Sequence, residues 1–238
     1  MQYTTDVRII RLMCTGRVDP TMVADAFIEG ADGIMVVGCH YGDCHYISGN
    51  YQAKVKMGLA SRALAYAGLN PARVAFNQCS SAEGDRFVSL VSTFHDNICE
   101  IGPLGSAENL PLPKLKDRVE TARTALAGEK LRWVLGKFTE FESIGNKYGE
   151  KFTEHEMWRT LDTLVIDEIA THGLIKEMRK GAASVVGLAE RLEIAPPAAL
   201  KYVLALQRRG MVELAGVEGA TPSYKLLESG LRDFGSVS

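Results

Sequence analysis

The sequence has none of the extremes of composition that mark a membrane, export or nucleic-acid-binding protein. No apolar run among its 238 residues approaches the ~18 residues that a membrane-spanning helix needs. Neither sign of charge dominates, since 27 Lys and Arg stand against 29 Asp and Glu, for a net charge of −2. The first residues, 1–6, do not form the basic and then apolar pattern of an export signal. These absences predict a cytoplasmic globular protein without a membrane span and without strong attraction for nucleic acid.

Cysteine is absent from the last 139 residues, although five cysteines precede them: Cys14, Cys39, Cys44, Cys79 and Cys99. An odd number of cysteines in a chain without an export signal makes a disulfide framework the weaker interpretation. Reduced thiols then serve either as small buried side chains or as ligands. Cysteines that only filled a core would be expected in both halves, so the uneven distribution predicts different roles for the two halves.

The sequence also lacks the common enzyme fingerprints. It contains no Gly-x-Gly-x-x-Gly after a strand, no Walker loop and no Gly-x-Ser-x-Gly. A nucleophile pair of Cys44 with His40 or His45 is conceivable. Because that pair leaves Cys14 and Cys79 unexplained, we expect a non-catalytic protein.

Residues 7–102 alternate between strands and helices, as is typical of a parallel α/β domain. Asp19 followed by Pro20 favours the start of a helix, and Gly30 stands where the cap of that helix is expected. The predicted elements are strands at 7–13, 33–38 and 73–77, and helices from residue 20, at 50–67 and at 82–99. They make up the first predicted domain, residues 1–102, an α/β domain with a small parallel sheet and flanking helices.

The remaining sequence predicts a linker and a mostly helical module. Residues 102–113 hold three of the eight prolines and form the linker, and a long helix is predicted from Leu115 to Phe141. These belong to the second segment, residues 103–153. The third domain, residues 154–238, is predicted to contain helices at 184–192 and 196–209 and strands at 210–214 and 223–227. Two short helices followed by a hairpin resemble a winged helix-turn-helix.

The winged-helix-like module favours protein docking over DNA binding. Its helix at 196–209 offers Lys201, Gln207 and Arg208 for contact with bases, but the body of that helix is apolar. Residues 155–238 carry ten Lys and Arg against eleven Asp and Glu, so their attraction for a duplex is weak. We therefore expect the module to dock another protein.

Four of the cysteines follow predicted strands. Cys14 follows the first strand, Cys39 and Cys44 follow the second, and Cys79 follows the third. Open α/β sheets build their sites at the carboxyl ends of parallel strands, so these four thiols are predicted to meet at one edge. Four thiolates suit zinc or an iron–sulfur cluster, and the C-x4-C step favours a 2Fe–2S cluster. Buried inert thiols are the alternative.

The fifth cysteine and the histidines have other predicted roles. Cys99 lies next to Ile98 of an apolar helical stripe, so it is expected in the core rather than among the ligands. His40 and His45 flank the cysteine loop, and we expect them to hydrogen-bond or pack beside the site. His172 is expected on a helix face.

Two long motifs resemble a known family. Residues 8–20, Arg-Ile-Ile-Arg-Leu-Met-Cys-Thr-Gly-Arg-Val-Asp-Pro, form the first, and residues 30–51 form the second, with the sequence Gly-Cys-His-Tyr-Gly-Asp-Cys-His-Tyr-Ile-Ser-Gly-Asn-Tyr at 38–51. Both closely resemble the methyl-viologen-reducing hydrogenase delta-subunit family, and the segment 81–84 fits it as well. The resemblance covers residues 7–102.

The resemblance implies a 2Fe–2S subunit that passes electrons between partners. These partners are a hydrogenase, a formate dehydrogenase or another dehydrogenase on one side, and a flavin-containing heterodisulfide-reductase-like subunit on the other. By the motif match, Cys14, Cys39 and Cys44 carry over as ligands. Family members typically begin with a further strand and a C-x-x-C pair that this sequence does not show, so our hypothesis is that Cys79 supplies the missing ligand and a partner the missing strand. A winged-helix redox-sensing regulator with a metal or iron–sulfur site is the alternative, and a zinc-stabilised scaffold is a third.

Overall fold

The computed structural model describes residues 4–227, without the side chains of Thr139 and Ser143, and its chain divides into two compact units, residues 1–165 and 166–238. Residues 228–238, which belong to the third predicted segment, lie outside the described part. Helix α6 (Glu154–Met178) begins in the first unit and ends in the second. Between residues 4 and 227, no helix is both long and apolar enough to cross a bilayer.

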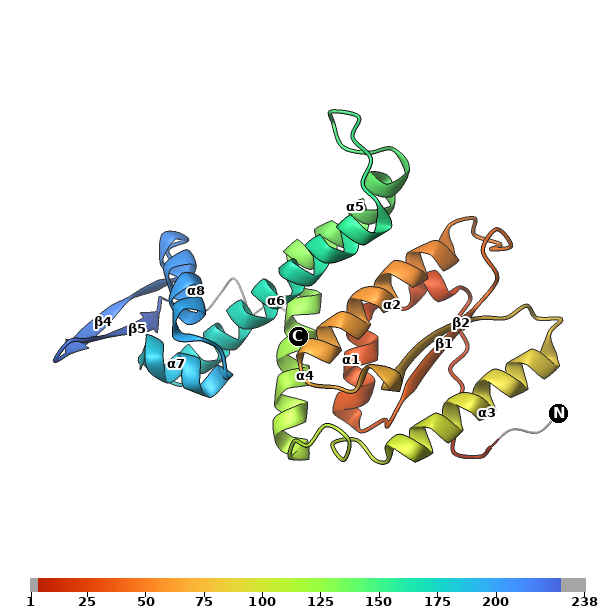
Figure 1. The fold of residues 1–238 in the computed structure, drawn as a ribbon, viewed down its shortest axis with the longest axis horizontal. Coiled ribbons are helices and arrows are strands. Elements are labelled where there is room, and N and C mark those ends of the chain that lie inside the picture. The colour runs from red at the N-terminus through yellow and green to blue at the C-terminus, as the bar shows by residue number, and fades with distance from the viewer. Residues whose placement is uncertain (1–3, 228–238) are drawn as a thin grey trace. The chain divides into compact units, whose positions relative to one another are not determined.

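The first unit has the predicted α/β class. Its elements, in chain order, are η1 (Thr15–Arg17), α1 (Pro20–Glu29), β1 (Ile34–Gly38), α2 (Gly49–Tyr66), η2 (Pro71–Arg73), β2 (Val74–Gln78), α3 (Gly84–Ile101), α4 (Leu112–Ala127) and α5 (Glu129–Ser143). Strands β1 and β2 are parallel, with Ile34 opposite Val74 and Gly38 opposite Gln78. Helices α1 and α2 lie on one side of the strands and α3 on the other (Figure 1).

Helix α1 begins and ends at the residues that its sequence predicts. Asp19 Oδ1 accepts a hydrogen bond of 2.9 Å from the backbone N–H of Thr21, and Pro20 is the first helical residue. Gly30 ends the helix with a φ of 105°, a left-handed conformation that glycine adopts without a steric penalty. These caps fix where the chain turns toward β1.

The predicted strand at 7–13 is wrong. Within residues 4–227, β1 pairs with β2 alone, and residues 7–13 have no regular structure. Ile10 and Met13 are about four-fifths exposed, at 81% and 79%. A β-branched, apolar composition favours a half-buried pleated surface, and the described part of the chain offers this segment neither a paired neighbour nor cover.

The predicted long helix at 115–141 is two helices, which is a second correction. Gly128 lies between α4 and α5 with a φ of −66° and a ψ of 148°, so the backbone is extended there and the helical hydrogen bonding stops. Helix α4 then packs against α1 and α2, and Arg123 of α4 forms a 2.8 Å ion pair with Asp25 of α1. The predicted continuous helix overlooked the low helix propensity of glycine, which makes residue 128 a favourable place for the helix to end.

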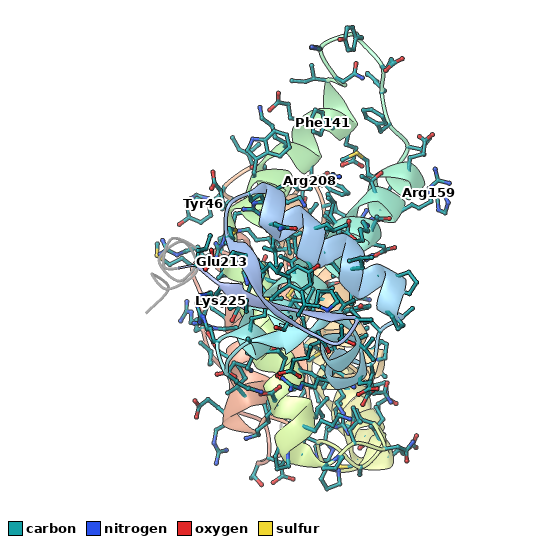
Figure 2. The ribbon with its side chains drawn as sticks, turned by 90° about the vertical axis from the view of Figure 1, so that its left-hand side faces the viewer. Tyr46, Phe141, Arg159, Arg208, Glu213 and Lys225 are labelled. Carbon is teal, nitrogen blue, oxygen red and sulfur yellow. The ribbon has the colours of Figure 1, made fainter. Side chains whose placement is uncertain are left out.

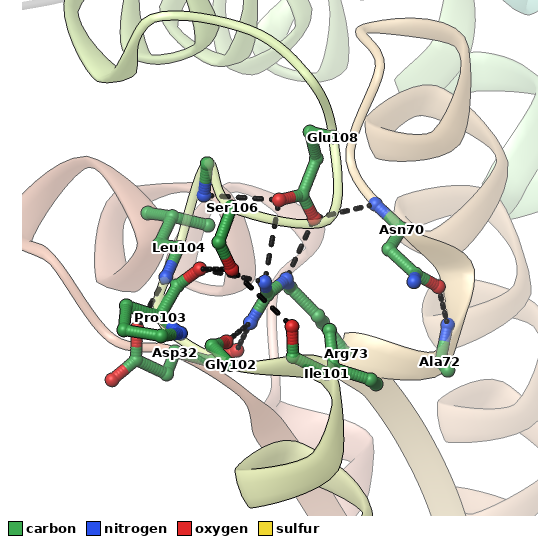
Figure 3. Close-up of polar contacts among 11 residues, drawn as sticks. Asp32, Asn70, Ala72, Arg73, Ile101, Gly102, Pro103, Leu104, Ser106 and Glu108 are labelled. Carbon is green, nitrogen blue, oxygen red and sulfur yellow. Dashed lines mark hydrogen bonds and ion pairs between the residues drawn. The ribbon is translucent and has the colours of Figure 1, made fainter.

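The predicted linker at 102–113 is a loop only as far as residue 111, because α4 begins at Leu112. One residue of this loop is held in the core. Glu108 forms an ion pair with Arg73 at 2.6 Å, and both side chains are fully buried. The guanidinium of Arg73 also donates to the carbonyl oxygens of Asp32, Gly102 and Pro103 (Figure 3). The loop after α3 is thereby fastened to the beginning of β2.

The second unit consists of short helices and a small antiparallel sheet. After α6 it contains β3 (Ala183–Ser184), α7 (Val185–Leu192), α8 (Pro196–Arg208), β4 (Val212–Glu218) and β5 (Thr221–Leu226), with the sheet order β3–β5–β4. Strand β3 was not predicted. Glu213 and Lys225 face each other across β4 and β5 at 3.1 Å (Figure 2). Leu188, Val203 and Leu206 lie in the hydrophobic core of the second unit. The predicted mostly helical module with a hairpin is therefore confirmed.

Candidate metal centre

Three of the four predicted ligand cysteines converge at the carboxyl edge of the sheet. Cys14 precedes η1, and Cys39 and Cys44 lie in the loop that follows β1. The sulfur atoms of Cys14 and Cys44 are 3.9 Å apart, and the Cys39 thiol lies close enough to Cys44 for that neighbour to raise the pKa of Cys39. The structure therefore brings thiols together from positions 30 residues apart in the chain.

Glycine is required at the point where these thiols meet. A Cβ atom on Gly49, the first residue of α2, would collide with Cys14 Sγ and would lie 3.1 Å from Cys44 Sγ. A Cβ atom on Gly16 would lie 2.9 Å from the Cα atom of Gly49, so the two backbones are in close contact as well. The spacing of the cysteines gave no sign of the role of Gly49.

Backbone N–H groups point at two of the sulfur atoms. The N–H of Gly16 donates to Cys14 Sγ at 3.4 Å. Burial acts to raise the pKa of Cys44, but the N–H groups of Asn50 and Tyr46 and the neighbouring thiols outweigh it, so the pKa is lowered. Burial and then the contact with Cys44 raise the pKa of Cys39. A lowered pKa favours the thiolate form of Cys44, which is the form that binds metals.

Asn50 fastens the cysteine loop to α2, and sequence reasoning missed it. Its side chain is fully buried at the start of α2. The side-chain amide donates to the carbonyl oxygen of His40 at 2.6 Å and to that of Cys39 at 3.3 Å. A buried amide is expected to have such partners, so Asn50 fixes the path of the loop between β1 and α2.

Cys79 occupies the matching position at the end of β2. Gly38 and Gln78 are paired residues of the two strands, so Cys39 and Cys79 are the next residue on each strand. The N–H of Cys79 donates to the carbonyl oxygen of Gly38 at 2.8 Å. The Cys79 thiol itself donates to the carbonyl oxygens of Ser80, at 3.4 Å, and Glu83, at 3.3 Å. Its role as a ligand remains a prediction.

A histidine–glutamate pair joins the two loops. His40 Nε2 lies 2.6 Å from Glu83 Oε2, and the same carboxylate oxygen accepts a 2.7 Å hydrogen bond from the N–H of Ser80. The N–H of Ser80 and then His40 lower the pKa of Glu83. The prediction that His40 hydrogen-bonds beside the site is confirmed, whereas Glu83 was missed.

The residues present fit a cluster that is shared between several thiols. Within residues 4–227, no three His, Cys, Asp or Glu side chains surround one point as the ligands of a single metal ion would. A 2Fe–2S cluster divides four thiolates between two irons, so its ligands need not meet at one point. Two buried atoms beside the cysteines, Thr15 Oγ1 and Gln78 Nε2, have no hydrogen-bond partner in the same part of the chain. Orphaned polar atoms of this kind accord with a group that binds between the loops.

Cys99 is exposed, which corrects the prediction that it lies in the core. The apolar stripe of α3 includes Val91, Phe94 and Ile98, and one further residue turns by about 100° around a helix, which takes Cys99 out of that stripe. Its sulfur lies 3.6 Å from His95 Nε2, on the same helix. Within the described residues, the hydrogen-bonding contacts of the Cys99 sulfur are with His95 alone.

Comparison with known proteins agrees with the sequence motifs. The family described as "methyl-viologen-reducing hydrogenase, delta subunit" (FlpD) matches residues 1–102. An iron–sulfur subunit of the vhc F420-non-reducing hydrogenase from Methanococcus voltae is 40% identical over 109 residues, which cover 46% of this chain and 76% of that protein. The chain belongs to this family. The corresponding iron–sulfur subunit of the F420-non-reducing hydrogenase from Archaeoglobus profundus is also 40% identical, over 42% of this chain and 74% of its own length.

This chain is also similar to part of a larger polypeptide. One polypeptide of the ferredoxin/F420H2-dependent CoB–CoM heterodisulfide reductase of Methanosarcina acetivorans is 42% identical over 106 residues. Those residues are 44% of this chain but only 13% of the length of that polypeptide. The family match ends at residue 102, so it includes all five cysteines and none of α4 to β5.

Proposed function

We propose that the chain is a non-catalytic 2Fe–2S electron-transfer subunit of a cytoplasmic oxidoreductase complex. It would receive electrons from a hydrogenase, a formate dehydrogenase or another dehydrogenase and exchange them with a flavin-containing heterodisulfide-reductase-like subunit. The observation that carries the proposal is the approach of the Cys14 and Cys44 thiols to one another over Gly49, with the Cys39 thiol beside Cys44.

Cys14, Cys39, Cys44 and Cys79 are the proposed ligands. The strand register supports Cys79, because adjacent strands lie about 4.8 Å apart and Cys39 and Cys79 leave paired strand ends. The relatives that are named iron–sulfur subunits support the class of cofactor. A cluster bound here would accept and donate single electrons.

The surrounding residues would hold the thiols ready and tune the cluster. Cys44 is buried, so this sulfur is shielded from water. The N–H of Gly16 donates to the sulfur of Cys14, and the backbone of Asn50 lowers the pKa of Cys44. Hydrogen bonds to sulfur are one of the factors that set the potential of a cluster. None of these residues needs to transfer a proton to a substrate.

Metal analysis of anaerobically purified chain tests this proposal. We expect a coloured protein with equal iron and sulfide and no stoichiometric zinc. A colourless protein with one zinc would support the zinc-stabilised scaffold instead. In native extracts the chain should co-purify with an oxidoreductase, and a stable monomer that carries nothing with it would contradict the complex.

We extend the proposal to the winged-helix-like module as a docking element. Leu200 and Leu204 lie one turn apart on α8 and are 40% and 38% exposed. A helix that reads DNA needs polar and basic side chains on its outer face, and these two positions provide neither. Fluorescence anisotropy with labelled duplexes at physiological salt should show no sequence-specific binding. Tight, sequence-specific binding would favour the redox-sensing regulator.

A further inference from the structure

The loops that follow β1 and β2 are linked by a chain of contacts between side chains. Asn50 donates to the carbonyl oxygen of His40, the His40 ring pairs with Glu83 at 2.6 Å, and Glu83 accepts from the N–H of Ser80. Cys39 adjoins one end of this chain of contacts and Cys79 adjoins the other. The two loops are therefore joined by a defined bridge in addition to the strand pairing.

We propose that the His40–Glu83 bridge is the positioning element that sets the spacing between the Cys39–Cys44 loop and the Cys79 loop, and with it the stability and the reduction potential of the cluster. This inference rests on the proposed function. Neither residue is proposed as a ligand, and both act through the cysteines beside them.

Both ends of the bridge are fixed independently, which is what a positioning element needs. The backbone of His40 is held by Asn50, whose side chain is fully buried. The carboxylate of Glu83 is held by the N–H of Ser80 at 2.7 Å, and the carbonyl oxygen of Glu83 accepts from the Cys79 thiol at 3.3 Å. A shift of Glu83 would therefore move the backbone that surrounds Cys79.

The carboxylate also contributes charge close to the cysteines. The Glu83 carboxylate accepts from the N–H of Ser80 and pairs with His40, and partners of this kind favour its charged form. Negative charge beside a cluster disfavours the reduced state, which carries one more electron. Removal of this charge without removal of the hydrogen bond is expected to make the potential more positive.

The neighbouring His45 provides a matched control. It belongs to the same loop and packs edge-on against Tyr46, with ring centroids 5.1 Å apart. Within residues 4–227, no hydrogen bond or ion pair joins His45 to the loop after β2. His45→Ala therefore removes an imidazole from the loop and leaves the bridge in place.

The test compares the full-length wild type with His40→Ala, Glu83→Ala, the double variant, His40→Gln, Glu83→Gln and the His45→Ala control, all purified anaerobically. The readouts are the rate of iron loss to a chelator, the EPR spectrum of the reduced cluster and its reduction potential. We expect His40→Ala and Glu83→Ala to lose iron about 10-fold faster, as is usual for residues that support ligands. The double variant should lose iron no faster than either single variant, because the two side chains act as one unit.

The conservative variants separate positioning from folding. Glutamine at position 40 can still donate to Glu83, so His40→Gln should restore the retention and the EPR spectrum of wild type. Glu83→Gln should retain iron but shift the potential to a more positive value. If His40→Ala and Glu83→Ala behave like His45→Ala in a wild type that carries a 2Fe–2S cluster, the positioning role is overturned. A wild type without such a cluster overturns the proposed function and this inference together.

Discussion

The guanidinium of Arg73 holds the carboxylate of Glu108 through two hydrogen bonds, of 2.6 Å from Nε and 3.2 Å from Nη2, and solvent reaches neither side chain. The pair joins the residue before β2 to the loop between α3 and α4. Burial acts to raise the pKa of Glu108, but Arg73 and the N–H groups of Asn70 and Gly105 lower it overall. Glu108 is thus an ionised group whose partners are all supplied by the protein.

Replacement of one member of this pair should destabilise the first unit strongly. Arg73→Ala leaves the Glu108 carboxylate buried without its cation, at a cost of about 3–5 kcal/mol in the free energy of unfolding. Urea denaturation followed by circular dichroism measures this cost. Arg123→Ala is the control, since its ion pair with Asp25 is partly exposed and should contribute less than about 1 kcal/mol. Equal effects of the two variants would contradict the role of the buried pair.

Gly49→Ala should prevent assembly of the site. The added methyl group would occupy the space next to Cys14 Sγ and Cys44 Sγ, so we expect iron content to fall to a small fraction of wild type. Gly136→Ala is the matched control, because a Cβ atom at this position of α5 meets nothing within 4 Å. The control should keep its iron and gain about 0.5–1 kcal/mol of helix stability. An iron content in Gly49→Ala equal to that of the control would show that the thiols do not need this close approach.

The second unit should lose stability in mild acid because of His172. The pKa of His172 is lowered to about 4, mainly by burial, with smaller lowering effects of Arg179 and Arg209 that Glu168 opposes. Between the unfolded value of about 6.5 and pH 4, the unfolded chain takes up a proton that the folded chain does not. Stability is therefore complete above pH 6.5 and falls by up to about 3 kcal/mol as the pH approaches 4. Denaturation between pH 7 and 4 should show a shallower decline in His172→Leu, and an unchanged slope in this variant would contradict the assignment.

Replacement of Cys79 should change the visible spectrum of the cluster, and replacement of Cys99 should not. Cys99→Ala is expected to leave the visible spectrum unchanged, because this exposed thiol lies on α3 next to His95. Cys79→Ala is expected to lose or convert the cluster. Visible absorption of the two anaerobically purified variants compares them directly. The opposite pattern would show that the fourth ligand is wrongly assigned.

Local signals in the sequence predicted most of the elements. Asp19, Pro20 and Gly30 act within a few residues of the helix that they delimit, so their roles could be inferred without the fold. The strand at 7–13 could not be judged in this way, because a strand depends on a neighbour that pairs with it. The break at Gly128 was missed because a continuous apolar periodicity says little about a single glycine within it.

The residues of the candidate site also differ in whether local sequence signals or contacts between loops reveal their roles. The position after a strand was sufficient to group Cys39 and Cys44, because the edge of a parallel sheet collects such residues. Cys14 was grouped with them through the predicted strand at 7–13, which does not form, and it reaches Cys44 from the residue before η1. Gly49, Asn50 and Glu83 carry no thiol that would mark them as ligands, and their roles follow from contacts between loops. Whether Cys99 is exposed depends on its angular position around helix α3, and the partial burial of its sequence neighbour Ile98 does not determine that position.

EPR spectroscopy of the anaerobically purified, dithionite-reduced wild type tests the central claim most directly. The account predicts one S = 1/2 signal of a reduced 2Fe–2S cluster, with two irons and two sulfides per chain. The signal should be absent in the oxidised protein and should return on re-reduction. A reduced protein that is EPR-silent and contains zinc in place of iron would contradict the account.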